Sequence, residues 1–208
     1  MCRKFWLSPF CQMNRFSALI TMRLISGTAG GIPLEVPKTV TRPTQDRVRQ
    51  AIFSMLGEVV PEAKVLDLFA GSGAFGLECL SRGAASAMLV DQDRRACDVI
   101  RRNIAKTRLE GATVRVGDVF RTVETLQAPE PAFDLIFADP PYAHHPGDKD
   151  LIASLMALEA LPHLLPSGGH LLLESLATPK PPAFDAAVWE LLTDRSYGST
   201  RIVLLRKR

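Results

Sequence analysis

Cysteine is scarce in this sequence, and its placement argues against the usual cysteine chemistry. The four cysteines form no CxxC pair, and the last two fall in helix-like apolar patterns: Cys2, Cys11, Cys79 and Cys97. Zinc sites and disulfide frameworks depend on regularly spaced cysteines. We therefore expect a protein without a metal that works in a reducing compartment, the cytoplasm.

Long apolar runs are missing as well. No stretch approaches the roughly 20 apolar residues of a membrane span, so we expect no membrane partner. Residues 1–21 begin with basic residues, but Pro9, Gln12 and Asn14 interrupt any hydrophobic segment, and no small-residue cleavage site follows. We expect this stretch to be a poorly ordered N-terminal extension, with a short partner-binding arm as the alternative.

The remaining composition is typical of a globular protein with one sizeable core. The chain has 208 residues, of which 47% are apolar and 23% are charged. Strand-like runs are expected at 64–69, 85–91, 113–116, 133–138, 168–174, 188–192 and 202–205, with helices at about 75–81, 94–106, 119–126 and 149–164. This alternation predicts an α/β fold with a mostly parallel seven-stranded sheet. The last two strands leave no room for a helix between them and should pair antiparallel.

A glycine-rich turn follows the first of the predicted parallel strands. Residues Gly71 to Gly76 satisfy the pattern G-x-G-x-x-G, and Asp91 lies about 20 residues further on, at the end of the next strand. This is the Rossmann fingerprint between a strand and a helix, with an acid placed to accept hydrogen bonds from ribose hydroxyls. The spacing predicts a cofactor that contains a ribose.

Asp67, inside the strand before this turn, indicates which cofactor binds. A carboxylate there would repel the pyrophosphate of NAD, whereas it would attract the ammonium and sulfonium groups of S-adenosylmethionine. We therefore expect S-adenosylmethionine, with S-adenosylhomocysteine as product, and keep NAD as the alternative. Asp118 is placed to meet the adenine amino group and to cap the next helix. The expected cofactor site comprises Asp67, Phe69, Ala70, Gly71, Ser72, Gly73, Gly76, Asp91, Gln92, Asp118, Val119 and Asp139.

The strand at 133–138 ends in Asp139-Pro140-Pro141-Tyr142. Two prolines cannot continue a hydrogen-bond ladder, and ligands of open α/β sheets bind at the carboxyl ends of strands. An exocyclic amino group is a poor nucleophile, because its lone pair is delocalised into the base. Asp139 and the carbonyl of Pro140 could accept its N–H hydrogens and aim the lone pair at a sulfonium methyl group. Tyr142 offers a face on which a flipped base can stack. We predict that these four residues are catalytic, in a direct methyl transfer without a covalent intermediate.

Net positive charge is concentrated at the start of the chain. Residues 1–50 hold eight basic and two acidic side chains, and the remainder holds 17 basic and 20 acidic ones. This asymmetry favours a polyanionic partner. A helix is expected over about 45–57, with Thr44 as its N-cap. Arg47 and Arg49 lie outside its apolar stripe, so we expect both to point away from the core.

Four segments resemble a known family: TRPTQDRVRQAIFSML (41–56), LDLFAGSGAFGLECLSRGA (66–84), DLIFADPPY (134–142) and YGSTRIVLLR (197–206). They are similar to the RsmD-type bacterial 16S ribosomal RNA guanine-N2 methyltransferases. The resemblance implies a class I S-adenosylmethionine-dependent methyltransferase that modifies one guanine of small-subunit RNA, preferably in the assembled particle. It also implies that Arg42, Thr44, Arg47 and Arg49 contact RNA. We expect a monomer with a basic RNA-contacting segment, 22–57, followed by the methyltransferase domain, 58–208.

The chain departs from the family pattern in several places. Ile32 replaces a basic residue, Gln45 replaces a small polar one, and Asp91 replaces the commoner Glu. The loop with His144 and His145 is particular to this chain. Alternative functions remain a DNA adenine-N6 or another amino-methyltransferase, which generally has Asn before the prolines, and an NAD-binding oxidoreductase or a binding-only protein.

Overall fold

The computed structural model describes residues 22–37, 44–126, 132–142 and 147–208. The expectations for residues 1–21, for Arg42 and for the loop with His144 and His145 lie outside the described residues. Near its start, the described chain forms a small antiparallel pair, β1 (Met22–Arg23) with β2 (Pro33–Leu34). The division into 22–57 and 58–208 stays a prediction.

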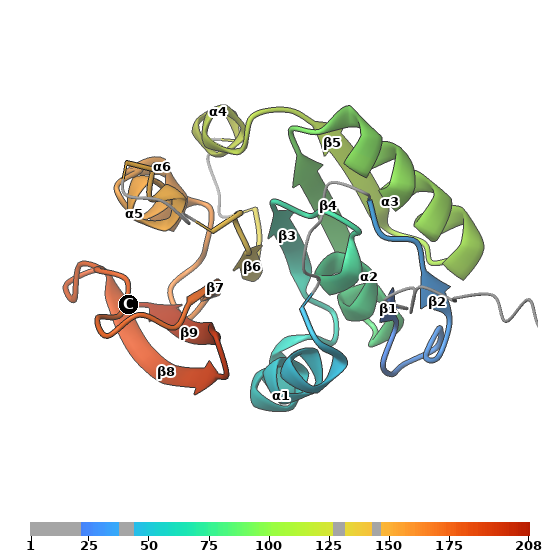
Figure 1. Ribbon diagram of the computed structural model, residues 1–208, viewed down its shortest axis with the longest axis horizontal. Helices are drawn as coiled ribbons and strands as arrows, with labels where there is room; N and C mark the ends of the chain where they lie inside the picture. Colours follow the sequence, from blue (N-terminus) through green and yellow to red (C-terminus); the bar gives the residue numbers. More distant parts are fainter. Residues whose placement is uncertain (1–21, 38–43, 127–131, 143–146) are drawn as a thin grey trace, which may run out of the picture.

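The centre of the molecule is a seven-stranded sheet, as the alternating pattern predicts. Its spatial order is β5-β4-β3-β6-β7-β9-β8 (Figure 1). The first five strands in this order are parallel, and β9 pairs antiparallel with both β7 and β8. The strands are β3 (Lys64–Leu68), β4 (Ser86–Asp91), β5 (Ala112–Val116), β6 (Leu135–Ala138), β7 (His170–Leu176), β8 (Trp189–Tyr197) and β9 (Thr200–Lys207).

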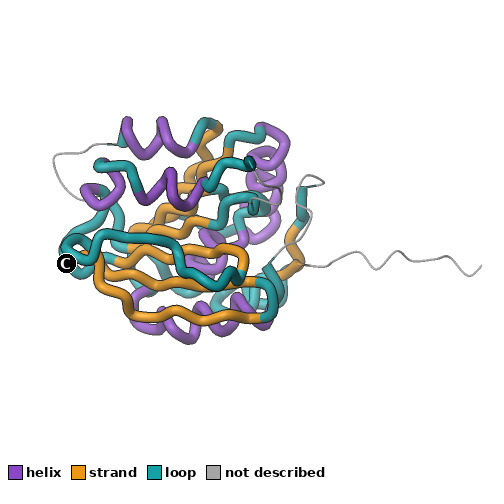
Figure 2. Tube along the Cα trace, turned by 60° about the vertical axis from the view of Figure 1, so that its left-hand side comes forward, coloured by secondary structure: helices purple, strands orange, loops and turns teal. Residues whose placement is uncertain are grey.

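Helices cover both faces of this sheet (Figure 2). One face carries α1 (Asp46–Leu56), α2 (Ala74–Ser81) and α3 (Arg94–Thr107), and the 3-10 turn η1 (Gly57–Val59) follows α1. The other face carries α4 (Val119–Thr125), α5 (Leu151–Met156) and α6 (Ala160–His163). Among the described residues, none of the helices combines the length and the apolar composition that a bilayer span requires.

The two cores follow from the alternation of side chains along each strand. In β3, Val65 faces the core under α1 to α3, whereas Leu66 and Leu68 face the core under α4 to α6. Both faces of a parallel strand are buried in such folds, so the strand is apolar throughout. Apart from the exposed Lys64 at its start, β3 departs from this pattern at Asp67, which is only 2% exposed. A buried acid in this position requires a reason beyond packing.

Two expectations about helices are wrong. The helix expected over 149–164 is interrupted between α5 and α6. Pro162 has no N–H to bond the carbonyl of Leu158, which instead accepts from Leu161 N at 3.2 Å. Thr44 is not the N-cap of α1, because the cap residue is Gln45 and the N-terminus has no side-chain cap bond. The Thr44 hydroxyl is directed toward buried carboxyl groups instead.

Candidate active site

The carboxyl ends of the parallel strands lie along one edge of the sheet, and every one of them carries an acid. Asp67 lies within β3, Asp91 ends β4, Asp118 follows β5, Asp139 follows β6, and Glu174 lies near the end of β7. Sequence analysis predicted the first four of these as site residues and missed Glu174. The parallel order gathers these acids, because parallel strands end on the same side.

The glycine turn after β3 allows the protein backbone to approach a ligand closely. Gly71 and Gly73 have φ of 54° and 80°, a left-handed conformation that glycine adopts without strain. A Cβ at Gly76 would lie 2.9 Å from Leu89 Cδ2, so α2 packs closely against β4 only because this position has no side chain. These observations match the roles that the fingerprint assigns to its glycines.

Asp91 holds this turn in place. Its Oδ2 accepts a hydrogen bond from Gly71 N at 2.8 Å, and its Oδ1 accepts one from Asp93 N at 2.8 Å. A carboxylate has about four lone-pair positions, so acceptor capacity remains for ribose hydroxyls. Gln92 is exposed beside it.

Asp67 is a buried acid that accepts a single backbone bond, from Gly76 N to Oδ2 at 2.9 Å. Burial raises its pKa from 3.8 to about 7, the bond from Gly76 opposes this rise, and the charge of Asp91 adds to it. The carboxyl group is therefore poised between its two protonation states near neutral pH. A cation placed beside it would favour the ionised form.

Three of the predicted cofactor residues turn their side chains away from the edge of the sheet. Ser72 is 6% exposed and donates its hydroxyl to Met22 Sδ at 3.1 Å. Val119 is 2% exposed and packs in the core under α4. Ala70 is also buried, and its N–H bonds the carbonyl of Val90 at 3.0 Å. These positions can therefore offer a ligand mainly their backbone.

The predicted adenine end contains an exposed acid and an aromatic pair. Asp118 accepts a hydrogen bond from Arg121 N at 2.9 Å, which confirms its expected role as the cap of α4. Phe69 has a φ of 60° and meets Phe120 edge to face at 6.2 Å between ring centroids. Lys149 Nζ lies 5.0 Å from the centroid of Phe120.

The segment from Asp139 to Tyr142 is tied to two distant parts of the chain. Thr44 Oγ1 lies 3.4 Å from Asp139 Oδ2, and 3.2 and 3.1 Å from the two carboxyl oxygens of Glu174. Tyr142 donates its hydroxyl to Glu174 Oε1 at 3.0 Å. A hub of four side chains from α1's leading segment, β6 and β7 therefore surrounds the end of β6.

Both carboxyl groups of this hub are hard to ionise. Burial, the charge of Glu174 and the charge of Asp67 raise the pKa of Asp139 well above its usual value, and the bond to Thr44 opposes them. Burial also raises the pKa of Glu174. The pKa of the Tyr142 hydroxyl is raised as well, by burial first and by the two nearby carboxylates next. The oxygen atoms of the hub are therefore suited to accept hydrogen bonds or to bind a positively charged group.

The two arginines in the first turn of α1, Arg47 and Arg49, differ in exposure. Arg47 is exposed on α1, in agreement with its predicted orientation. The prediction that Arg49 points away from the core is wrong: its side chain is 0% exposed. Its Nη2 donates to the carbonyl of Arg23 and, at 2.8 Å, to Asp46 Oδ1. The guanidinium of Arg49 is thus engaged inside the protein and is not presented on the exposed side of α1.

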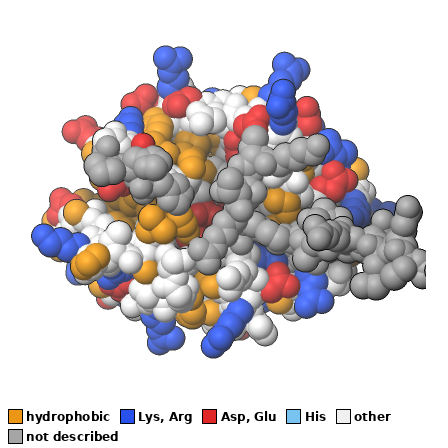
Figure 3. All heavy atoms as spheres, viewed as in Figure 1, with side chains coloured by type: hydrophobic (Ala, Val, Ile, Leu, Met, Phe, Trp, Pro, Cys, Tyr) orange, Lys and Arg blue, Asp and Glu red, His pale blue; other side chains and the backbone are white. Residues whose placement is uncertain are grey.

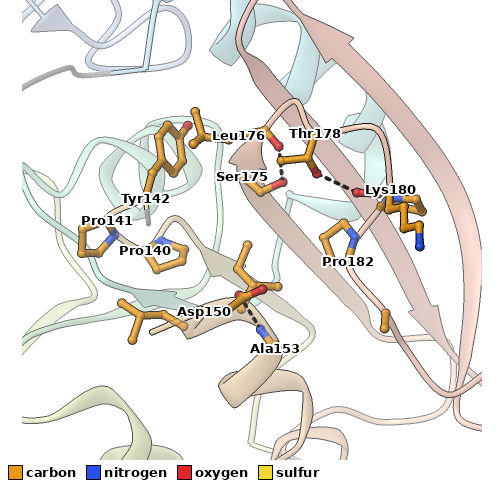
Figure 4. Close-up of a pocket in the computed structure, with 14 residues that line it drawn as sticks. Pro140, Pro141, Tyr142, Asp150, Ala153, Ser175, Leu176, Thr178, Lys180 and Pro182 are labelled. Atoms are coloured by element: carbon orange, nitrogen blue, oxygen red, sulfur yellow. Dashed lines mark hydrogen bonds between the residues drawn. The ribbon is translucent and has the colours of Figure 1, made fainter. Parts of the chain in front are cut away.

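A pocket of about 430 Å³ adjoins the acid-Pro-Pro-Tyr segment. Pro140, Pro141 and Tyr142 line one side, and the opposite wall includes Ser175, Leu176, Thr178, Lys180 and Pro182 (Figure 4). Hydrophobic side chains gather on this face of the molecule, between α5 and the strands β7 to β9, with acidic side chains beside them (Figure 3). The pocket is large enough for a planar ring and its sugar.

Comparison with known proteins identifies relatives over nearly the whole described chain. The family described as "Conserved hypothetical protein 95" matches residues 22–206. The "Putative rRNA methyltransferase YlbH" of Bacillus subtilis is 34% identical over 191 residues, which cover 90% of this chain and 100% of that protein. The "Ribosomal RNA small subunit methyltransferase D" of Escherichia coli K12 is 38% identical over 122 residues, 58% of this chain and 60% of that protein.

Solved structures show the same fold. A hypothetical protein of Thermus thermophilus superposes with a TM-score of 0.74 and 34% sequence identity, covering 88% of this chain and 98% of that one. The strand order, the glycine turn and the antiparallel end of the sheet are those of the class I S-adenosylmethionine-dependent methyltransferase fold, as predicted.

Proposed function

Because the chain belongs to the RsmD-type family, matched as conserved hypothetical protein 95, we propose that it methylates the exocyclic N2 of a guanine in 16S ribosomal RNA. The methyl donor is S-adenosylmethionine. The observation that carries this proposal is the position of Asp139 beside two prolines at the end of β6, next to the strand that holds Asp67. The names of the two rRNA methyltransferase relatives support the RNA substrate.

The residues along the sheet edge fit the methyl donor. When bound, S-adenosylmethionine supplies an electrophilic methyl group on a sulfonium, which an amino nitrogen can take by direct displacement. Asp67, with its pKa raised to about 7, gains its charge when a cation lies beside it. Asp91 has free acceptor positions for ribose hydroxyls, and the exposed Asp118 can accept from an adenine amino group. A dinucleotide pyrophosphate would instead meet the buried carboxyl of Asp67.

Asp139 and Pro140 bind the amino group of the base. The carboxylate of Asp139 and the carbonyl of Pro140 accept its two N–H hydrogens, so the nitrogen lone pair leaves conjugation with the ring. The ring of proline fixes φ and keeps that carbonyl oriented. Tyr142, anchored through its hydroxyl to Glu174 at 3.0 Å, presents a ring of fixed orientation to the base.

The RNA side of the site lies near the start of α1. Thr44 belongs to the hub, and the exposed Arg47 lies one turn further along the chain. Arg42 belongs to the same basic stretch of sequence. Arginine side chains beside the catalytic segment would suit a phosphate backbone, which supplies most of the affinity in nucleic-acid binding. We propose the small ribosomal subunit as the particle that presents this RNA, and a monomeric enzyme.

Labelled S-adenosylmethionine tests the proposal with purified small-subunit RNA and with particles from cells that lack this enzyme. We expect label on one guanosine, located by nuclease digestion and mass spectrometry as N2-methylguanosine. Label on adenine alone, or on protein alone, would refute the proposed function. Calorimetry with S-adenosylhomocysteine and with NAD checks the cofactor independently of any RNA.

A further inference from the structure

With both carboxyl groups ionised, the hub around Asp139 contains more hydrogen-bond acceptors than donors. Two carboxyl groups, those of Asp139 and Glu174, face one threonine hydroxyl and one tyrosine hydroxyl. The Thr44 hydroxyl has a single hydrogen, yet it lies within 3.1 to 3.4 Å of three carboxyl oxygens. It can satisfy only one of them at a time.

No positive side chain offsets this excess within the described part of the chain. None of the ion pairs there involves Asp139 or Glu174. Glu174 is nevertheless 2% exposed, so water provides little compensation. Buried carboxyl groups that lack donors are costly, and a site with this arrangement is best completed by a ligand that brings N–H groups.

Guanine is the standard base whose pairing edge brings adjacent N–H groups. Its N1–H and N2–H₂ lie side by side, whereas adenine and cytosine each place an unprotonated ring nitrogen next to the amino group. Thr44 Oγ1 touches Asp139 and Glu174 at once, so the two acids are close enough for one base edge to reach both. An adenine edge would leave one acid facing a ring lone pair.

We infer that Glu174 is a specificity-determining residue, whose carboxylate accepts N1–H of the target guanine while Asp139 accepts from N2. This inference rests on the proposed function and names the group that selects the base. It explains why a buried acid follows the three buried leucines of β7, a feature that packing alone would not select. The hydrogen bond from the Tyr142 hydroxyl, at 3.0 Å, holds that carboxylate in place.

The test compares target RNA containing guanosine with RNA containing 2-aminopurine ribonucleoside at the methylated position. 2-Aminopurine keeps the N2 amino group but has no hydrogen on N1. We expect wild-type kcat/KM to favour guanosine by at least about tenfold, the value of one hydrogen bond to a charged group. In Glu174→Gln, whose amide can donate to a bare N1, this ratio should fall by about tenfold. Comparison of ratios cancels the intrinsic difference in nucleophilicity between the two bases.

Thr44→Val is the matched control. It removes hydrogen bonds around Glu174 but leaves the carboxylate, so the guanosine to 2-aminopurine ratio should stay at its wild-type value. An equal ratio in wild type and Glu174→Gln would overturn the inference while leaving guanine methylation intact. If Glu174→Gln does not fold, Glu174→Asp takes its place, because it withdraws the carboxylate by one methylene, and a wild-type ratio in that variant overturns the inference. A wild-type enzyme that labels no guanosine would instead refute the proposed function.

Discussion

Asp139 follows a buried strand and precedes two prolines, so its side chain can be changed without disturbing the local backbone. We predict that Asp139→Ala lowers kcat for RNA methylation by about 10²- to 10³-fold, the usual effect of removing one preorganised group at the reacting centre. S-adenosylhomocysteine affinity, measured by calorimetry, should change only a few-fold. Asp139→Asn keeps one acceptor oxygen and should fall between wild type and Ala. Transfer by the Ala variant within a few-fold of wild type would contradict this role.

Asp67 gives the cofactor site a pH dependence. Burial raises the pKa of this carboxyl to about 7 in the ligand-free protein, and only the ionised form attracts a cation. Affinity for S-adenosylmethionine should therefore fall by roughly tenfold on lowering the pH from about 8 to 6, because protonation of Asp67 removes its charge. Calorimetry in buffers of different ionisation enthalpy should detect proton release on binding at pH 7.

Asp67→Asn provides the control for this titration. The amide oxygen can still accept the hydrogen bond from Gly76, but it does not titrate. Binding should be weaker and no longer change between pH 6 and pH 8. If the variant keeps the wild-type pH profile, another group is responsible for it.

At the scale of elements, α1 is joined to β1 through a buried arginine. Arg49 reaches the carbonyl of Arg23 and the acid Asp46, but its Nε and Nη1 have no partner among the described residues. Unpaired buried donors cost about 1–3 kcal/mol, so Arg49→Met should change the free energy of unfolding by no more than about 1 kcal/mol, or increase it. Asp46→Ala, which leaves the buried guanidinium without its carboxylate, should destabilise the protein by about 3 kcal/mol or more. Urea denaturation measures both; a larger loss in Arg49→Met would contradict this account.

The elements themselves were largely predictable from sequence, because apolar runs of strand length alternate with helical patterns. The site residues on β3, β4 and β6 were predictable for a related reason: each motif is contiguous along the chain. Glu174 was missed, although the run LLLE in β7 marks a buried apolar stretch that is followed by an acid. Its partner Thr44 is 130 residues away, and no local pattern encodes a contact at that separation. Arg49 was misplaced because a helical stripe does not show that a long polar side chain can fold under the helix.

At the scale of the whole molecule, the segment that leads into α1 adjoins the acids of the sheet edge. The acids of the sheet edge come from five parallel strands, whereas the first 50 positions carry a net positive charge, and Thr44 of that segment contacts the same edge. An acidic interior would by itself repel a phosphate backbone. The basic segment therefore lets an anionic polymer approach a site whose own groups attract cations and N–H donors.

The salt dependence of RNA affinity therefore shows which basic side chains contact phosphate groups. Each phosphate contact contributes about one unit to the slope of log affinity against log salt concentration, or slightly less on single strands. We predict that Arg47→Ala lowers this slope by about one, and that Arg42→Ala with Arg47→Ala lowers it by about two, without loss of S-adenosylhomocysteine binding. Arg49→Met should leave the slope unchanged, because this side chain is buried. Lys106→Ala removes an exposed charge from the last turn of α3 and serves as the control. An equal effect of Lys106→Ala and Arg47→Ala would mean that net charge, rather than the segment that leads into α1, draws the RNA to the site.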